Sequence, residues 1–317
     1  MEKSNLRKLF GRLAYKFFFK PTLPLRYNLK HFGIAGSAKM IYGEQQMKKA
    51  AANLPSFPLL TNHVLEVSYL TGKRYWHQTA FCAYSLAKIL QGKIKINIYS
   101  DGSLSKYQSN VLSKGLPGIE IIKMHEILHQ LEKRLPQNSF PTLRFLRENN
   151  PFFRKLIDMR LNDRYIVQLD SDMLFFNTPS ELLNSYQTGG NYFMQDTLQN
   201  SYYVLDEKII EEHLKVNIKE KINSGILAYN SKDIDWVYVE ECCKFLLDRI
   251  EVISPPMFEQ TLNAIIISKL NGKPLDDSYH ILYDSDKEIK QESDVVRHYI
   301  FKAKKQYFIN EWKKIIH

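Results

Sequence analysis

The segment Tyr-Ile-Val-Gln-Leu-Asp-Ser-Asp-Met-Leu-Phe-Phe, residues 165–176, places two carboxylates directly after an apolar run. The composition of residues 165–169 predicts a buried strand, and a second apolar stretch at 173–176 follows the aspartates at once. Asp170 and Asp172 should therefore lie in a turn that is held from both sides. Carboxylates at this spacing can converge on one divalent cation, and hard cations such as Mg²⁺ or Mn²⁺ prefer oxygen ligands. The segment predicts a metal site, although a capped surface turn would also use aspartates.

Strands and helices alternate around this segment. Short β-branched runs at 63–70, 94–99 and 119–124 predict strands, and helical spacing of apolar residues follows at 76–90 and 105–114. This alternation predicts an α/β fold with a mostly parallel sheet covered on both faces. Because such sheets bind ligands outside the carboxyl ends of their strands, we expect the functional residues in the loops at those ends.

Composition restricts the class of protein. The chain has 317 residues, of which 44% are hydrophobic and 25% are charged, as in ordinary globular proteins. Its apolar runs are shorter than the ~20 residues that a membrane-spanning helix needs. Cys82, Cys242 and Cys243 lack zinc-type spacing and are too few for a disulfide framework. These features favour a reducing, cytoplasmic location.

The net charge of +10 is concentrated at the N-terminus. Residues 1–50 contain 11 Lys and Arg against two acids, Glu2 and Glu44, whereas residues 51–317 contain 33 basic and 32 acidic side chains. We therefore divide the chain into a basic N-terminal arm, 1–50, and one domain, 51–317.

The arm has the pattern of an amphipathic helix. Leu and Phe recur at three- and four-residue steps from Leu6 to Phe18, and Lys and Arg occupy the other positions. Pro21 and Pro24 are expected to end this helix. A basic helix of this kind can lie on an anionic membrane surface, but the same stripe can pack on the protein's own core, so both interpretations stay open. The cations interrupt any secretory signal, and no recognised nucleic-acid-binding motif occurs elsewhere.

The motifs around the aspartates resemble the GT-A glycosyltransferases, which use a strand-terminal Asp-x-Asp to hold a metal bound to a sugar nucleotide. The resemblance covers about residues 63–305, and it is nearest to the retaining group that contains glycogenin and the lipopolysaccharide galactosyl- and glucosyltransferases. It implies a GT-A fold and transfer of a hexose from a nucleotide-diphosphate donor, with uridine diphosphate as the nucleotide. The other segments that carry it are Phe-Arg-Lys-Leu-Ile-Asp at 153–158, Ile-Asn-Ser-Gly-Ile-Leu-Ala-Tyr-Asn at 222–230, Glu-Gln-Thr-Leu-Asn at 259–263 and Val-Val-Arg-His-Tyr at 295–299.

The resemblance implies that Asp170, Asp172 and His298 hold Mn²⁺ or Mg²⁺, which neutralises the leaving diphosphate. The group ends with the signature His-x-x-Gly-x-x-Lys-Pro-Trp. Here His298 is followed by Tyr-Ile-Phe-Lys, without the glycine or the tryptophan. Of the lysines that follow, we expect Lys302 to contact the diphosphate, with its neighbours at 304 and 305 as alternatives.

The same resemblance implies a catalytic group of Asn223, Glu259 and Gln260. An Asn side chain can bind sugar hydroxyls, Gln260 would orient the donor, and an inverting reaction would use a base such as Glu259. For Arg154 and Asp158, four residues apart on a helix, a simple ion pair explains the spacing equally well. The residues expected to bind the donor are Thr71, Gly72, Asp101, Arg154, Asp158, Ser171, Gly225 and Lys302.

Two other classes of protein share parts of this pattern. Phosphatases of the haloacid dehalogenase type also end a strand in Asp-x-Asp, but that strand comes early in their core, and Leu174 replaces their usual Thr or Val. A membrane-peripheral binding protein without chemistry would not need both aspartates, Asn223 and His298. We therefore expect a glycosyltransferase whose partners are a nucleotide sugar, a glycan or glycolipid acceptor and an anionic membrane surface, and not nucleic acid.

Overall fold

The structure is a computed structural model that describes residues 20–198, 201–250 and 254–316. A seven-stranded sheet in the order β3-β2-β1-β4-β7-β6-β8 forms its centre. Of these strands, β7 alone runs antiparallel to its neighbours, so the predicted mostly parallel sheet is confirmed. The strands are β1 Leu65–Thr71, β2 Ile94–Ser100, β3 Glu120–Ile122, β4 Tyr165–Leu169, β6 Tyr192–Gln195, β7 Ile222–Asn230 and β8 Lys273–Pro274.

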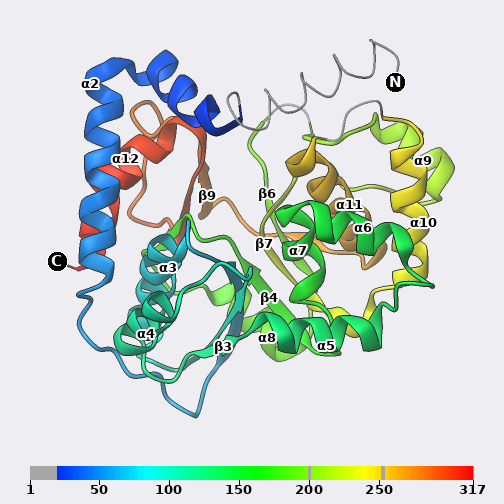
Figure 1. The fold of residues 1–317 in the computed structure, drawn as a ribbon, viewed down its shortest axis with the longest axis horizontal. Coiled ribbons are helices and arrows are strands. Elements are labelled where there is room, and N and C mark those ends of the chain that lie inside the picture. Colours follow the sequence, from blue (N-terminus) through cyan, green and yellow to red (C-terminus); the bar gives the residue numbers. More distant parts are fainter. Residues whose placement is uncertain (1–19, 199–200, 251–253, 317) are drawn as a thin grey trace, which may run out of the picture.

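Helices cover both faces of the sheet (Figure 1). Alternate side chains of a strand point to opposite faces, and on β7 Ile226 and Ala228 join an apolar cluster with α3, whereas Leu227 and Tyr229 join a second cluster with α7, α10 and α11. The sheet therefore lies between two apolar cores. The helices are α2 Lys20–Ala51, α3 Trp76–Ile89, α4 Lys106–Gly115, α5 Met124–Arg134, α6 Pro141–Asn149, α7 Pro151–Asp158, α8 Ser180–Thr188, α9 Glu207–Leu214, α10 Trp236–Leu247, α11 Pro255–Lys269 and α12 Lys304–Ile309, with short 3₁₀ helices at Ser231–Asp233, Phe301–Ala303 and Glu311–Ile315.

A smaller sheet has the order β5-β10-β9 and consists of β5 Met173–Phe175, β9 Tyr279–Leu282 and β10 Val296–Tyr299. Because β5 follows β4 after residues 170–172, the aspartate turn connects the two sheets. Antiparallel pairing of β10 with β5 places His298 opposite Met173, and the backbone N–H of Tyr299 donates to the carbonyl of Asp172 at 2.9 Å. This register brings a histidine from near the C-terminus to the aspartate turn.

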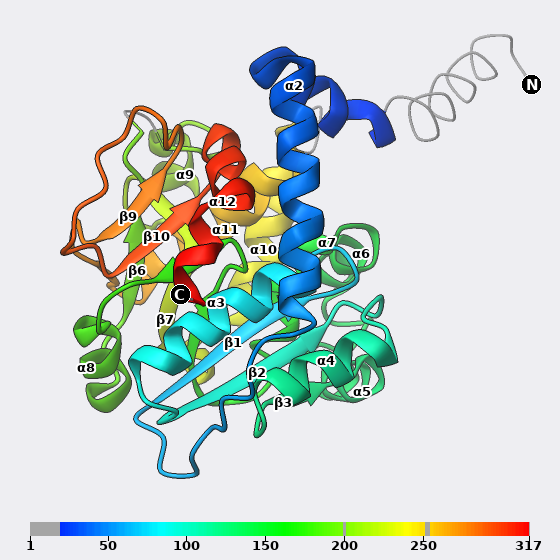
Figure 2. The same ribbon diagram turned by 90° about the vertical axis from the view of Figure 1, so that its left-hand side faces the viewer.

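Helix α2 lies along the domain beside α12, as two perpendicular views show (Figures 1 and 2). Met40 and Met47 are buried against the domain. At Gly43 the two helices approach so closely that a Cβ atom would clash with the carbonyl oxygen of Phe308. The part of the basic arm from Met40 to Met47 therefore packs on the protein's own core.

The helix that Pro21 and Pro24 were expected to end lies before Lys20, outside the described residues. Helix α2 is described from Lys20 and includes both prolines. A proline is least disruptive near a helix start, because the first N–H groups have no partner within the helix. Gly33, with φ 65°, interrupts α2 and produces the bend visible in Figure 2. The predicted amphipathic helix over residues 1–19 lies outside the described residues. Among the residues that are described, no helix has both the length and the apolar character needed to cross a membrane.

Candidate functional site

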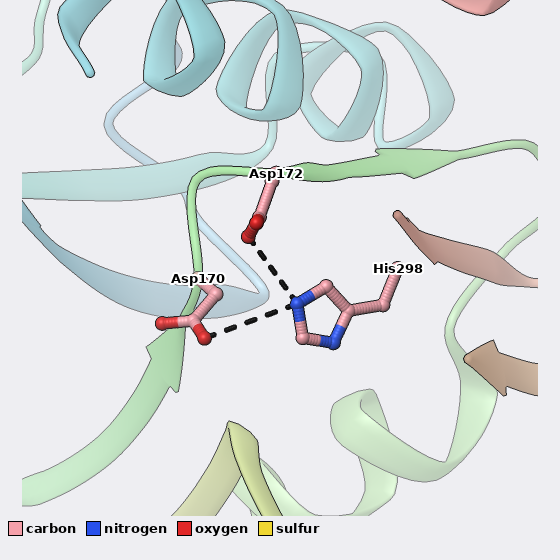
Figure 3. A group of neighbouring side chains, drawn as sticks. All are labelled: Asp170, Asp172 and His298. Atoms are coloured by element: carbon pink, nitrogen blue, oxygen red, sulfur yellow. Dashed lines mark ion pairs between the residues drawn. The ribbon is translucent and has the colours of Figure 1, made fainter. Parts of the chain in front are cut away.

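The two aspartates and the histidine form the centre of the candidate site, and their side chains point toward one another (Figure 3). The Nε2 atom of His298 lies 3.2 Å from Oδ1 of Asp172 and 3.9 Å from Oδ2 of Asp170. One ligand atom from each of the three residues lies within 4.8 Å of the others. Two carboxylates and an imidazole at these separations fit one divalent cation that accepts oxygen and nitrogen ligands.

Gly225 on β7 leaves the space that the imidazole fills. A Cβ atom at this position would lie 2.8 Å from Cε1 of His298 and 2.7 Å from Oδ1 of Asn223. The carbonyl of Gly225 also accepts the backbone N–H of Asp170 at 2.8 Å, which ties the aspartate turn to β7. The absence of a side chain at this position therefore permits His298 to approach the two aspartates.

Two lysines form ion pairs with the aspartates. The Nζ atom of Lys155, on α7, lies 2.6 Å from Oδ1 of Asp170, and that of Lys304, at the start of α12, lies 2.7 Å from Oδ2 of Asp172. Burial disfavours the charged form of Asp172, but Lys304 and His298 outweigh it and hold the pKa of this carboxyl below its usual value. Burial also disfavours charged lysines here, yet the neighbouring carboxylates raise the pKa of both. Asp172 and both lysines are therefore charged at neutral pH.

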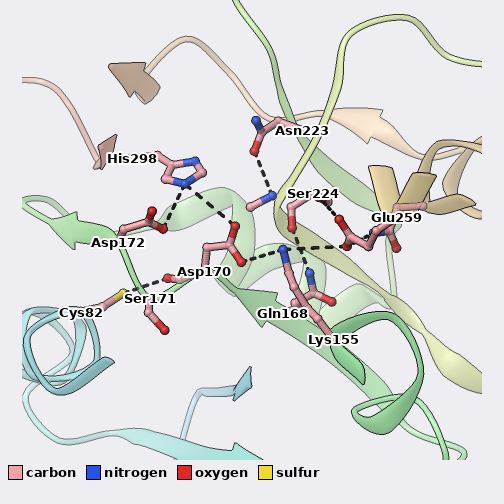
Figure 4. Close-up of polar contacts among 12 residues, drawn as sticks. Cys82, Lys155, Gln168, Asp170, Ser171, Asp172, Asn223, Ser224, Glu259 and His298 are labelled. Atoms are coloured by element: carbon pink, nitrogen blue, oxygen red, sulfur yellow. Dashed lines mark hydrogen bonds and ion pairs between the residues drawn. The ribbon is translucent and has the colours of Figure 1, made fainter. Parts of the chain in front are cut away.

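Glu259, on α11, lies beside this charged group (Figure 4). Ser224 donates a hydrogen bond to its Oε2 at 2.9 Å, Asn263 donates to its Oε1, and Lys155 Nζ lies 3.9 Å from Oε1. Burial raises the pKa of Glu259, and the charge of Lys155 opposes that shift. The carboxyl group is consequently fixed in position by three neighbours.

One cleft of about 240 Å³ is lined by the two aspartates, His298, the two lysines and Glu259. The three residues predicted to be catalytic, Asn223, Glu259 and Gln260, line it together with the predicted metal ligands. Its polar lining is mostly buried or half-buried, whereas several of its apolar residues are exposed. The polar lining consists of Lys155, Asp170, Asp172, Asp196, Asn223, Ser224, Glu259, Gln260, Tyr283, His298 and Lys304, and the exposed apolar lining of Phe152, Leu198, Tyr202, Pro256 and Phe301.

Thr71, at the end of β1, and Ser171, within the aspartate turn, do not line the cleft. The hydroxyl of Thr79, on α3, donates to Oγ1 of Thr71 at 2.7 Å and lies 2.8 Å from Oγ of Ser171. Figure 4 shows the Ser171 side chain directed away from His298. These hydroxyls link β1 and α3 to the turn.

Gly72 and Asp101 lie at the carboxyl ends of β1 and β2, also outside the cleft lining. A Cβ atom on Gly72 would clash with the carboxylate of Asp101, so glycine permits the two loops to meet. Oδ1 of Asp101 accepts the backbone N–H of Ser103 at 2.8 Å and its hydroxyl at 2.7 Å. Arg154 donates to the carbonyl of Asp101 rather than reaching the aspartate pair. These contacts hold the loop after β2 in place and connect it to α7.

Asp158 is part of a buried ion pair with Arg147 on α6. Nε and Nη2 of Arg147 lie 2.5 and 3.0 Å from the two carboxylate oxygens of Asp158. The two side chains are 3% and 0% exposed, and burial raises the pKa of Asp158 although Arg147 opposes the shift. This pair connects α6 to α7 and does not line the cleft.

The structure brings Lys304, rather than Lys302, to the aspartates. The Nζ atom of Lys302 lies 3.8 Å from Oδ2 of Asp284. Lys304 is six residues after His298, which is the spacing from His to Lys in the signature His-x-x-Gly-x-x-Lys. The signature therefore contained the information that identifies this lysine.

Sequence reasoning missed Asp196 and Tyr283, which also line the cleft. The hydroxyl of Tyr283 donates to Oδ1 of Asp196, and Nδ2 of Asn223 donates to Oδ2 at 3.3 Å. Neither residue belongs to a motif. Their proximity arises because the ends of β6, β7 and β9 meet.

No protein-family model matches this chain, and a comparison with curated protein sequences finds no match. Solved structures are similar in fold. WbbM, a bifunctional glycosyltransferase in its apo form, superposes with a TM-score of 0.50 at 12% identity, over 82% of this chain and 52% of WbbM. The galactosyltransferase LgtC, solved with donor and acceptor sugar analogues, has a TM-score of 0.48 at 12% identity, over 80% of this chain and 94% of LgtC.

The chain has a GT-A fold. Mouse xyloside xylosyltransferase 1 is another similar structure, with a TM-score of 0.48 at 13% identity, over 74% of this chain and 96% of that one. The element order of this chain and its superposition on WbbM confirm the fold implied by the sequence resemblance. At these identities the likeness concerns the arrangement of the chain, so the chemistry has to be argued from the site.

Proposed function

We propose that this protein is a metal-dependent glycosyltransferase that moves a sugar from a nucleotide-diphosphate donor, with uridine as the nucleoside, to a glycan or glycolipid acceptor. The convergence of Asp170, Asp172 and His298 at one cleft of a GT-A fold carries this proposal. LgtC, which is similar in fold, binds donor and acceptor sugar analogues in the same crystal structure. The haloacid dehalogenase alternative is disfavoured because its Asp-x-Asp strand comes early in the core, whereas here β4 follows β1, β2 and β3.

The donor set suits Mn²⁺ or Mg²⁺, because two carboxylates and one imidazole leave coordination positions for phosphate oxygens. When bound, such an ion acts as a Lewis acid that stabilises the negative charge of the leaving diphosphate. Lys155 and Lys304 would add to this stabilisation, since ammonium groups form strong charge-assisted hydrogen bonds with phosphate oxygens. The nucleotide would lie against the carboxyl ends of β1 and β2, where Thr71, Gly72 and Asp101 are located.

In this proposal Glu259 and Asn223 hold the donor sugar. Both oxygens of Glu259 already accept hydrogen bonds, so its carboxylate has a fixed direction from which it can accept a sugar hydroxyl. The side chain of Asn223 accepts the backbone N–H of Gly225 at 2.9 Å, which fixes it in the same way. We assign Gln260, which lines the same cleft, to orientation of the transferring sugar.

The decisive experiment measures sugar-nucleotide turnover and its dependence on metal. The protein should hydrolyse or transfer from one member of a sugar-nucleotide panel when Mn²⁺ is present, and EDTA should abolish this activity. Asp170→Asn and Asp172→Asn should each reduce turnover by at least about 100-fold, because each removes a metal ligand. Asp163→Asn is the matched control, because Asp163 is an exposed aspartate paired with Arg134 outside the cleft.

Two results would contradict the proposal. Release of phosphate from simple phosphate esters, without turnover of sugar nucleotides, would indicate a phosphatase. Neither turnover nor thermal stabilisation by any sugar nucleotide with Mn²⁺ would indicate that the cleft does not bind this class of donor.

A further inference from the structure

The lining of the candidate cleft includes five exposed apolar side chains, which together we call the apolar wall. Phe152, Leu198, Tyr202 and Phe301 are between 37% and 50% exposed, and Pro256 is exposed beside them. Soluble domains usually cover large apolar side chains, and clusters of them at a functional cleft mark binding surfaces. The charged residues of the cleft do not explain why these apolar side chains are exposed, so we ask what they bind.

Phe301 is held in an unusual backbone conformation. Its φ of 45° lies in the left-handed region, which residues with a side chain rarely adopt and which favours glycine. Its ring stacks on Tyr283, with centroids 5.8 Å apart and planes 18° apart, and the hydroxyl of Tyr283 is anchored on Asp196. Strained residues that persist because their surroundings hold them occur preferentially at functional sites. Here the strain presents an aromatic ring to the cleft at a position where the family signature has glycine.

Most of the apolar wall lies on the opposite side of β4 from the expected nucleotide site. In the sheet order, β1 and β2 lie on one side of β4, and β7 and β6 lie on the other. Leu198 and Tyr202 follow β6, and Pro256 is on α11, which packs on β7. Phe301 stacks on Tyr283, whose hydroxyl is bound to Asp196 directly after β6. Phe152 is on α7, which packs on α11. The charged lining between the two sides suits a diphosphate. A glycosyltransferase binds a donor and an acceptor. Because the nucleotide of the donor is expected at β1 and β2, the side with the apolar wall is available for the acceptor.

We propose that the apolar wall binds the apolar part of an amphipathic acceptor, in which the hydroxyl that receives the sugar is joined to an alkyl, acyl or aryl group. This inference rests on the proposed function and names the class of its acceptor. The apolar wall combines aliphatic Leu198 and Pro256 with three aromatic rings, and this composition suits a flexible apolar chain better than the flat face of a single sugar ring. Burying methylene groups against such a surface is favourable in proportion to the area covered.

The test compares hexyl β-D-glucopyranoside with methyl β-D-glucopyranoside by saturation-transfer NMR on the full chain. Saturation should reach the hexyl protons, and the hexyl compound should bind about ten times more tightly than the methyl compound. Phe301→Gly should abolish most of this difference and still fold, since glycine suits the backbone conformation at this position. Phe301→Tyr should retain the difference because it keeps the ring.

Val237→Ala is the matched control for non-specific adhesion, because Val237 is 61% exposed on α10 and does not line the cleft. The inference is overturned if only the sugar protons receive saturation, if Phe301→Gly binds the hexyl compound as the wild type does, or if Val237→Ala loses as much signal. Failure of the proposed function is recognised separately, as lack of metal-dependent sugar-nucleotide turnover by the wild-type protein.

Discussion

At the scale of single residues, the chemistry of the cleft depends on how its charges are balanced. Asp170 and Asp172 each have a lysine partner, and His298 completes the group from another sheet. Burial disfavours the charged forms of Asp172, Lys155 and Lys304, but opposite charges within hydrogen-bonding distance outweigh it, so the pKa of Asp172 is lowered and the pKa values of both lysines are raised. Small changes at these positions should therefore have measurable effects on stability and on metal affinity.

Replacing Lys304→Met should lower the free energy of unfolding of the metal-free protein by about 2 kcal/mol near pH 7, because it removes a charged hydrogen bond from Asp172. The pKa of Asp172 is lower in the folded protein than its ordinary value, so its stabilisation is present above that ordinary value and is lost as the pH falls below it. The variant should consequently lose less stability than the wild type on acidification from about pH 5 to about pH 2.

Urea unfolding followed by circular dichroism measures both effects. Lys302→Met is the matched control, since its amine is exposed and lies 3.8 Å from Asp284, and it should change stability by less than about 0.5 kcal/mol. An equal change in the two variants would show that Asp172 gains nothing from Lys304.

A second prediction at this scale concerns Gly225. In Gly225→Ala the added Cβ atom would lie 2.8 Å from the imidazole of His298, which has to move away from the aspartates. Mn²⁺ affinity, measured by electron paramagnetic resonance, should fall by at least about tenfold. Gly115→Ala is a suitable control, because its Cβ atom would make only ordinary contact with Leu54 at 3.6 Å. Unchanged Mn²⁺ affinity in Gly225→Ala would mean that His298 is not a ligand.

At the scale of the elements, the position of α12 depends on α2. Lys304 is the first residue of α12, and α12 packs on α2 where Gly43 meets the backbone of Phe308. A short helix of this kind has little stability of its own, so its direction is set by the elements that it contacts. The N-terminal helix thus supports a charged residue of the cleft although it contributes no side chain to the lining described here.

Gly43→Val should disturb this contact, because any Cβ atom clashes with the carbonyl of Phe308. We expect a loss of about 1–3 kcal/mol in the free energy of unfolding and a lower affinity for the sugar nucleotide, since Lys304 moves with α12. Calorimetric titration with the donor and chemical denaturation measure the two effects. Tyr42→Ala, at a neighbouring residue that is 67% exposed, should leave both unchanged. If Gly43→Val has the same stability and donor affinity as Tyr42→Ala, α2 does not position α12.

At the scale of the whole molecule, the charge is unevenly distributed along the chain. The domain is close to neutral, whereas residues 1–50 carry most of the net charge of +10. The part of α2 from Met40 to Ala51 packs on the domain. We propose that the basic, Phe- and Leu-rich residues 1–19 contact an anionic membrane.

Deleting residues 1–19 should abolish sedimentation with vesicles that contain about one third phosphatidylserine, because each lost cation near an anionic surface removes about 1 kcal/mol of attraction. Binding of the full chain should weaken at high salt and be absent from pure phosphatidylcholine vesicles. Metal-dependent donor hydrolysis should persist in the truncated protein. Equal vesicle binding by the truncated and full-length proteins would locate the membrane contact elsewhere or exclude it.

The sequence by itself determined the local elements and the place of the aspartate pair at the end of a strand. Strands predicted at 94–99 and 165–169 match β2 and β4 to within one residue, and Asp170 and Asp172 follow β4 as expected. These features depend on hydrophobic period and turn residues within short windows, which a linear reading can detect. The excess of basic residues in the arm could likewise be counted directly from residues 1–50.

Only the tertiary structure decided which distant side chains meet. The pairing of β10 with β5 places His298 at the aspartates, and the packing of α6 on α7 gives Asp158 the partner Arg147 instead of Arg154. The φ of Phe301 and its stacking on Tyr283 likewise follow from packing between distant segments. Such contacts depend on sheet register and on the fit between surfaces far apart in the chain, and no local pattern encodes them.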